Sequence, residues 1–479
     1  MKGGKVPDEI IPGRNDMTKT YDLTKGKPSR LILSFFFPML LTNMLQQVYS
    51  IADTAIVGKG LGDNALAAVG NISSLTFLII GFSMGLGNGF NVLTAQSFGA
   101  GDYKKLRRYL GSSIRLCIII AALLTTLSVI FLKDILILLQ TDEIIMADSL
   151  SYGMVIFAGL STSMLYNMCS GVLRALGDSK TPLLAIIIST IVNILLDCCF
   201  IFLFRTGVWG AAAATVMSQL LSSAVCLYKL RKIDFIRLSR SDFAFSLRLD
   251  GQLLKNGIPM ALMNSITAIG CMTVQFFVNG LGVAYTTAYS ACSRFINMFI
   301  QPACTAGYTM SAFASQNYGA KKYSRIKDGM HVCVLIASIS YFILGSAMVF
   351  APEFLGNILI DGDEAISIAA QYFRICGAAL FAVDFLFIFR SCVQGLGRPL
   401  IPMLSGIMEM VMRVGVIVLF ISGAGFKATA FAEIAAWVGA LSMNASAYFY
   451  ITRRKLGVNR RSKSENEPEH SAKPAVQAG

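Results

Sequence analysis

Long apolar runs alternate with short polar segments along almost the whole chain. Twelve runs are long enough to cross a membrane as a helix: 31–57, 72–97, 109–132, 150–173, 182–204, 209–228, 258–278, 290–314, 330–350, 367–393, 401–421 and 428–450. A hydrocarbon layer about 30 Å thick needs about 20 apolar residues in helical form. Short alternating strands, the mark of a transmembrane barrel, are missing. The pattern predicts an all-α integral membrane protein with twelve transmembrane helices.

Polar segments divide this helical block. We predict an N-terminal cytoplasmic tail over 1–30, a first six-helix lobe over 31–230, a cytoplasmic linker over 231–255, a second lobe over 256–452 and a disordered cytoplasmic tail over 453–479. Hydrophobic residues make up 55% of the chain and charged residues 14%, against about 25% charged in soluble proteins. All eleven cysteines fall in predicted spans, which favours small packing residues over disulfides.

Positive charge is distributed unequally between the two ends of the helices. The formal net charge is +14, and 32 of the 41 Lys and Arg residues lie in the two tails and in alternate loops. The other loops hold only Lys59, Lys133, Arg205 and Lys427. By the positive-inside rule both termini are cytoplasmic, in a multi-pass protein of the cell membrane. The basic surface predicts contact with anionic lipid, and we expect no nucleic acid and no obligate protein partner.

The two halves of the chain repeat one another. The segment "QSFGAGDY" at 96–103 returns as "QNYGAKKY" at 316–323, and "LGDSKTP" ending at Pro182 returns as "LGRPLIP" ending at Pro402, each 220 residues later. Six helices per half is an even number, so both halves enter the membrane from the same side and form parallel repeats. Transporters use this plan, with the substrate site between the halves. A channel or receptor on a duplicated scaffold is the alternative.

Several segments resemble a known family. "ADTAIVGKGLGDNALAAVG" (52–70), "GLGNGFNVLTAQSFGAGDYKKLRR" (85–108), "LRALGDSKTP" (173–182) and "ASQNYGAKKYSRIK" (314–327) are similar to multidrug and toxic compound extrusion (MATE) transporters, in the branch of the DNA-damage-inducible members. The resemblance implies secondary active efflux of amphipathic organic cations by antiport with Na⁺ or H⁺. It also implies alternating access between two lobes. No phosphate-binding loop occurs, so we expect an ion gradient as the energy source and no cofactor.

Acidic residues in the first half are the candidate coupling site. Placing Asp at the centre of a membrane helix costs roughly 2.5–3.5 kcal/mol, so such residues usually carry function. With the N-terminus inside, Asp53, Asp197 and Thr215 lie roughly 6–11 Å beneath the outer boundary at 1.5 Å per residue. Asn193 lies one turn from Asp197 on the same face. Together these oxygens suit Na⁺ or a proton, and in the resemblance they match polar positions of the first lobe. For Asp53 the alternative is an interface residue beside Lys59.

Further polar side chains lie near this group. Gln46 and Tyr49 share a helix face with Asp53, and Gln219 lies one turn after Thr215. These three are candidates for lining the transport pathway. Alternatively they form hydrogen bonds between helices.

The second half does not repeat these acids. Instead Glu409 and Arg413 are spaced i, i+4, and Asp384 and Arg390 add one charge of each sign. We expect ion pairs that hold or gate the second lobe. The alternative is that Asp384 or Glu409 forms a second cation or substrate site. Some branches of the family have an acid on the seventh helix, where "PMALMNSITAIG" has none.

Two other functions remain open at this point. A lipid-linked oligosaccharide or lipid flippase of the same superfamily should carry a cationic central cavity. A membrane-embedded enzyme would need a nucleophile and base or a metal set, and His331 at a span edge lacks such neighbours. We therefore predict a transporter and no enzyme activity.

Overall fold

The computed structural model describes residues 22–360 and 362–455, and these form helices with no strand. The first lobe contains α1 (Pro28–Leu61), α2 (Asp63–Gly99), α3 (Tyr103–Leu138), α4 (Glu143–Ala158), α5 (Leu160–Ala175), α6 (Lys180–Cys198) and α7 (Val208–Arg231). The second contains α8 (Leu247–Asn279), α9 (Val283–Phe299), α10 (Gln301–Gly319), α11 (Tyr323–Phe350), α12 (Pro352–Leu359), α13 (Asp363–Ala378), α14 (Leu380–Gly395), α15 (Leu400–Ala424) and α16 (Lys427–Tyr450). The predicted all-α fold class is confirmed.

Each predicted span coincides with one helix or with two consecutive helices. Nine helices of the described chain are long and apolar enough to cross a membrane, and the pairs α4–α5 and α13–α14 could each cross as one bent span. The remaining predicted span, 290–314, falls on α9 and α10. Their junction lies at Ile300, just before Pro302 in the first turn of α10. Proline is accepted in a first turn because that amide has no helical partner.

The repeat is visible in the backbone. The bends of 43° between α4 and α5 and of 48° between α13 and α14 lie at Gly159 and Ala379, which are 220 residues apart. Positive-φ residues recur at the same spacing: Gly62 with Gly282, Gly101 with Lys321, and Gly177 with Gly397. The two halves are therefore parallel structural repeats that share these turns and this bend, although the second half has additional breaks before α10 and α12.

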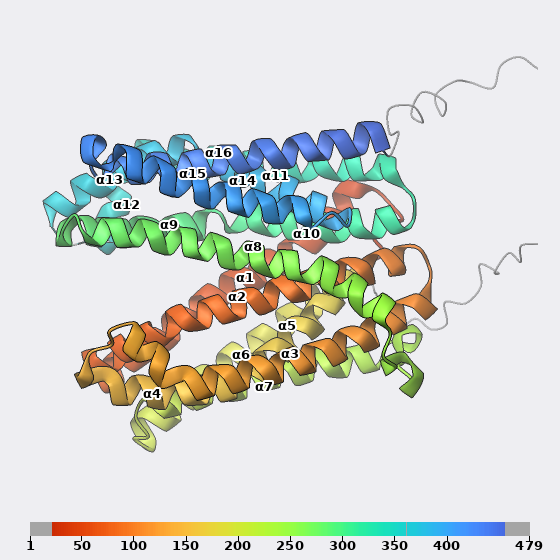
Figure 1. The fold of residues 1–479 in the computed structure, drawn as a ribbon, viewed down its shortest axis with the longest axis horizontal. Helices are drawn as coiled ribbons and strands as arrows, with labels where there is room; N and C mark the ends of the chain where they lie inside the picture. The colour runs from red at the N-terminus through yellow and green to blue at the C-terminus, as the bar shows by residue number, and fades with distance from the viewer. Residues whose placement is uncertain (1–21, 361, 456–479) are drawn as a thin grey trace, which may run out of the picture.

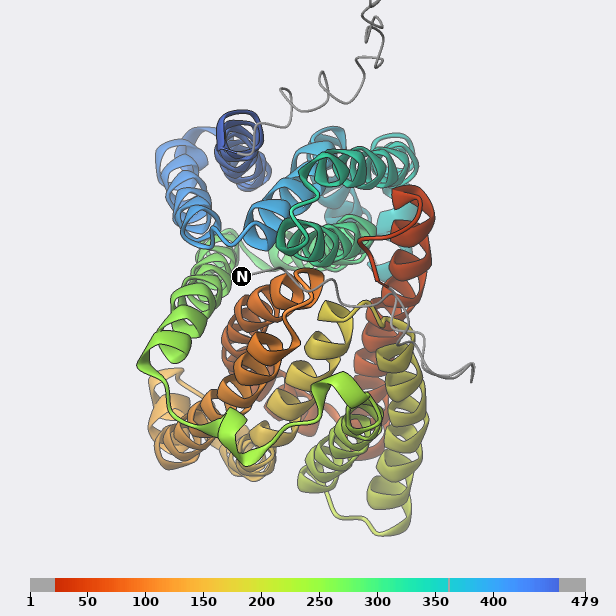
Figure 2. The same ribbon diagram turned by 90° about the vertical axis from the view of Figure 1, so that its right-hand side faces the viewer.

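The first helix of each half connects the two lobes. Figure 1 shows the lobes side by side, with α8 along their boundary, and Figure 2 shows α1 and α8 on opposite sides of the molecule. α8 packs on α2 of the first lobe as well as on α15. α1 in turn packs on α10 of the second lobe as well as on α6. Close approach of α8 to α2 depends on Gly89, where a Cβ would lie 2.5 Å from the Gly257 Cα.

The two lobes make a reciprocal contact at one end of the molecule. We call this the basic end: it contains the α2–α3 and α10–α11 turns and both ends of the described chain (Figure 1). The Gln96 Nε2 donates to the Gly395 carbonyl at 2.9 Å, and the Gln316 Nε2 donates to the Ala175 carbonyl at 2.8 Å. These two bonds are related by the 220-residue repeat. The repeated "QSFG" and "QNYG" motifs thus join the lobes, and the ribbons diverge toward the opposite end.

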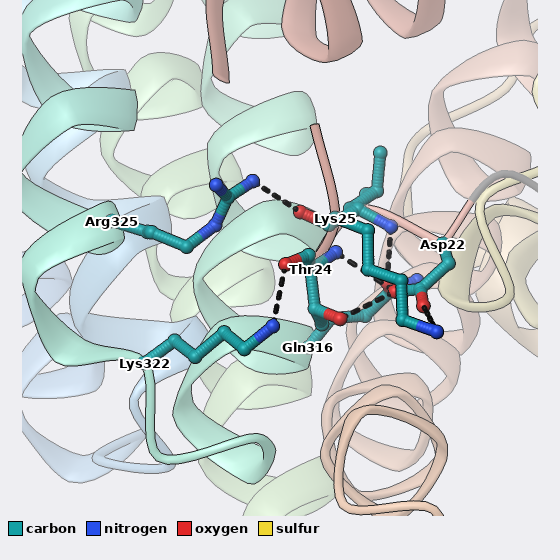
Figure 3. A network of polar contacts seen from close by, with 7 residues as sticks. Asp22, Thr24, Lys25, Gln316, Lys322 and Arg325 are labelled. Carbon is teal, nitrogen blue, oxygen red and sulfur yellow. Dashed lines mark hydrogen bonds and ion pairs between the residues drawn. The ribbon is translucent and has the colours of Figure 1, made fainter. Parts of the chain in front are cut away.

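The segment before α1 also lies against the second lobe at the basic end (Figure 3). Leu23 is only 1% exposed, and its amide donates to the Gln316 Oε1 at 3.0 Å. Lys322 Nζ donates to the Thr24 carbonyl at 2.9 Å, and Arg325 donates to the Gly26 carbonyl at 2.8 Å. The described part of the predicted tail 1–30 is therefore packed structure that runs into α1. Residues 1–21 of that prediction lie outside the described residues.

The other polar segments have short helices. The predicted linker 231–255 contains two 3-10 turns, Asp234–Ile236 and Arg240–Phe243, before α8 begins. Arg115 of α3 forms an ion pair with Asp250 in the first turn of α8, with a nitrogen-to-oxygen distance of 2.5 Å. Of the predicted C-terminal tail, only the first residues are described, as the turn Ile451–Lys455 that continues α16. Residues 456–479 lie outside the described residues.

Gly99→Ala should destabilise the fold by about 1–3 kcal/mol, the usual cost of overpacking. A Cβ at Gly99 would lie 1.9 Å from the Gln316 carbonyl oxygen, across the contact between the lobes. Gly87→Ala in the same helix is the control, because a Cβ there meets nothing within 4 Å, and removing a helical glycine should stabilise by about 0.5–1 kcal/mol. Thermal unfolding of the purified protein measures both. Equal effects of the two substitutions would contradict the contact.

Candidate functional site

The predicted coupling residues meet inside the first lobe. α1 supplies Asp53, α6 supplies Asn193 and Asp197, and α7 supplies Thr215. Asp53 is 9% exposed, whereas Asn193 and Asp197 are fully buried. A π-helical turn, Cys199–Leu203, follows α6 directly after Asp197. Such turns are rare and often found at functional sites.

Within the part of the chain that the structure describes, the two carboxyl groups lie next to each other without an ion-pair partner. The Asp53 and Asp197 side chains are within interaction distance, and the Asn193 amide lies beside Asp197. Among the described residues, the Asp53 Oδ1, both Asp197 oxygens and both polar atoms of Asn193 are buried without a hydrogen-bond partner. Buried polar atoms are nearly always hydrogen-bonded in proteins. This group of oxygens therefore fits a bound cation or a shared proton.

Two tyrosines complete the surroundings of the pair. The Tyr49 hydroxyl on α1 lies beside Thr215 and Ser218 of α7. Tyr152 on α4 lies within electrostatic range of Asp53 and Asp197. Tyr152 and Ser218 were not predicted from the sequence. Nothing in the spacing along the chain indicates that α4 packs against α7 and places Tyr152 near Asp53, so only the tertiary structure identifies them.

The other candidate pathway residues lie in different surroundings. Gln46 is exposed on α1, one to two turns from Asp53. Gln219 is half-buried, and its Oε1 accepts a hydrogen bond from the Ser163 hydroxyl of α5. That bond joins α5 to α7, which is the interhelical alternative considered for such residues. A role of Gln46, Tyr49 or Gln219 in the pathway remains a prediction.

The buried charges of α14, α15 and α16 are mostly paired. Arg390 of α14 forms an ion pair with Glu409 of α15, and Arg413 of α15 pairs with Glu433 of α16 at 2.8 Å. The i, i+4 residues Glu409 and Arg413 thus find partners on different helices. Asp384 of α14 is fully buried, and both its oxygens lack a hydrogen-bond partner in the described chain. The expectation of ion pairs fits this geometry.

Glu433 changes the charge balance that the sequence suggested. It was not among the predicted residues, and it brings the buried acids of α14, α15 and α16 to three against two arginines within the described chain. The i, i+4 spacing of Glu409 and Arg413 drew attention to these two residues, and Glu433 is distant from both in the chain.

No group of three or more His, Cys, Asp or Glu able to hold a metal ion occurs within 22–360 and 362–455. All eleven cysteines are free thiols.

Many membrane transporters are built from parallel repeats of membrane-crossing helices that surround buried polar sites. The MatE family model matches residues 38–199 and 259–419. The chain is 31% identical to the probable multidrug resistance protein YoeA of Bacillus subtilis over 73% of this chain and 78% of YoeA. It is 23% identical to a FAD transporter of Shewanella oneidensis over 83% and 88% of the two chains. The chain belongs to the MatE family of membrane transporters.

A solved structure shows the same fold. The outward-facing conformation of a multidrug resistance MATE family transporter superposes with a TM-score of 0.84, at 21% identity, over 93% of this chain and all of that one. The family model and the identity with YoeA confirm the predicted family, and the shared fold confirms two parallel six-helix repeats. Assignment to the branch of the DNA-damage-inducible members remains a prediction.

Glu433→Gln should destabilise the protein by about 3–5 kcal/mol, because it leaves the buried Arg413 guanidinium without its partner. Replacing both residues by methionine should recover most of that loss, since hydrophobic substitution of a buried pair is often neutral. Glu353→Gln, in the exposed pair with Arg374, is the control and should cost less than about 1 kcal/mol. Chemical unfolding measures all three. A Glu433→Gln effect no larger than the control would contradict a structural ion pair.

Proposed function

We propose that this transporter exports amphipathic organic cations by antiport with a monovalent cation, H⁺ or Na⁺. Asp53 and Asp197 hold the coupling ion, and Asn193 and Thr215 add oxygens to it. The observation that carries the proposal is the pair of adjacent buried carboxyl groups, which have no counter-charge among the described residues. Two like charges at this separation disfavour each other, so a proton shared between them or a bound Na⁺ stabilises the pair. Loss of that ion then favours the second of the two lobe arrangements between which the transporter alternates.

The distribution of charge supports a direction for this cycle. The basic loops gather at the end where the two lobes meet, and the positive-inside rule assigns that end to the cytoplasm. Both termini are then cytoplasmic, and the coupling site lies toward the outer side of the cell membrane. A coupling cation enters from outside, driven by about 2.3 kcal/mol per charge for each 100 mV of membrane potential. The proposal requires membrane lipid, no cofactor and no protein partner.

Names of relatives support efflux of drugs. YoeA is named a probable multidrug resistance protein. Another relative is named a FAD transporter, so relatives differ in what they carry. The substrate must therefore be inferred from the binding surfaces of this chain.

Transport by reconstituted protein tests the proposal. We expect an imposed H⁺ or Na⁺ gradient to drive flux of a fluorescent organic cation across liposomes containing the wild type. Asp53→Asn and Asp197→Asn should each reduce flux to the level seen without a gradient, because neither variant can hold the coupling ion. Asp134→Asn is the matched control, an exposed acid of the same lobe.

The outcomes separate the alternatives. Flux driven by only one of the two gradients identifies the ion. Normal coupling in both aspartate variants would overturn the first-lobe site and direct attention to Asp384. No gradient-driven flux in the wild type would overturn drug efflux in favour of a flippase.

A further inference from the structure

A second polar pocket lies between the lobes, away from the carboxyl pair. Residues of α1, α2, α5, α10 and α14 line it, and it measures about 50 Å³. Six of its seven polar lining residues form pairs 220 residues apart: Asn88 with Tyr308, Asn91 with Ser311, and Arg174 with Gln394. Equivalent residues of both repeats surround it, so it lies on the axis that relates the halves. We call it the axial pocket.

The axial pocket lies beside the contact that joins the lobes. Arg174 precedes Ala175, whose carbonyl accepts from Gln316, and Gln394 precedes Gly395, whose carbonyl accepts from Gln96. Opening of the lobes at the basic end would break these bonds and expose the pocket. Met39 of α1 lines the pocket, and Asp53 follows it by 14 residues, or roughly 20 Å of helix. The two sites are therefore separate.

Among the described residues, Arg174 is the only charged one that lines the axial pocket. Its guanidinium has neither an ion-pair nor a hydrogen-bond partner within the described chain. Asp178, the acid nearest to it in sequence, is already occupied: it accepts from the Lys180 and Thr181 amides and from the Thr181 hydroxyl. The second repeat has neutral Gln394 at the equivalent position. The positive charge is therefore a feature of one repeat only. Since neutral Gln394 packs at the equivalent position, the fold does not require a charge there.

The lining suits one kind of chemical group. A guanidinium offers paired N–H donors that match a carboxylate, and the side chains of Asn88, Asn91, Tyr308 and Ser311 add further donors. A cavity of roughly 10–15 Å³ holds one water molecule. The pocket therefore has room for a group of a few heavy atoms and not for a whole drug.

We propose that the axial pocket binds the carboxylate of an amphipathic substrate through Arg174. This deepens the proposed function: preferred substrates join a carboxylate to a cationic or apolar body, so zwitterions bind more tightly than simple cations. The carboxylate occupies the pocket, and the body of the substrate lies between the lobes.

Equilibrium binding to the purified full chain tests this without any gradient. The probes are a rhodamine with a free carboxylate and its methyl ester, which differ only in the anionic group. We expect the wild type to bind the acid more tightly than the ester. Arg174→Gln, which installs the residue of the other repeat, should weaken binding of the acid about 10–100-fold and leave binding of the ester unchanged. Arg174→Lys should retain part of the preference.

Each outcome has a distinct meaning. Equal affinity of the wild type for acid and ester would overturn the proposal, as would an equal loss of both in Arg174→Gln, which would indicate a structural role. Unchanged ester binding shows that the variant is folded. Asp53→Asn should keep the preference for the acid, since it lies in the other site. A preserved preference in a protein without gradient-driven flux would contradict the proposed function and leave this inference standing.

Discussion

A carboxylate inside a membrane-spanning helix must be neutralised by a partner, a proton or a bound cation, and this requirement organises the whole molecule. The second lobe meets it mostly with fixed partners, since Arg390 and Arg413 each hold a glutamate of a neighbouring helix. The first lobe leaves Asp53 and Asp197 side by side, with no positively charged partner in residues 22–360 and 362–455. A fixed arginine would stabilise that lobe permanently in one charge state. A pair without one depends on an ion that can arrive and leave, as a coupled transporter requires.

Duplication supplies the mechanical half of this arrangement. Gln96 and Gln316 make the same bond in opposite directions, and glycines 99 and 319 let the two helices meet closely at the axis. The contact closes one end only, and an equivalent contact at the other end would prevent access from both sides. Departures from symmetry then provide chemistry: the adjacent pair Asp53 and Asp197 belongs to the first repeat, and the axial pocket has Arg174 opposite Gln394. The two repeats thus share a backbone arrangement but differ in charge at the proposed ion and substrate sites.

Much of this fold was predictable because apolar length and the 220-residue repeat are properties of the sequence alone. The common depth of Asp53, Asn193, Asp197 and Thr215 followed from helix direction and rise, and the structure brings them together. Tyr152 and Glu433 were missed because their contacts depend on which helices are neighbours. The repeated "QSFG" and "QNYG" motifs revealed the duplication, but their contact across the axis required the tertiary structure.

The most direct measurement is the number of coupling ions displaced when the purified protein binds a saturating organic cation, with no membrane or gradient present. Proton release is followed in weak buffer, and radioactive Na⁺ is followed at equilibrium. If Asp53 and Asp197 act as one site, the wild type should release about one ion per molecule, and Asp197→Asn, which should still bind the organic cation, should release none. The same release from Asp197→Asn as from the wild type would contradict the account.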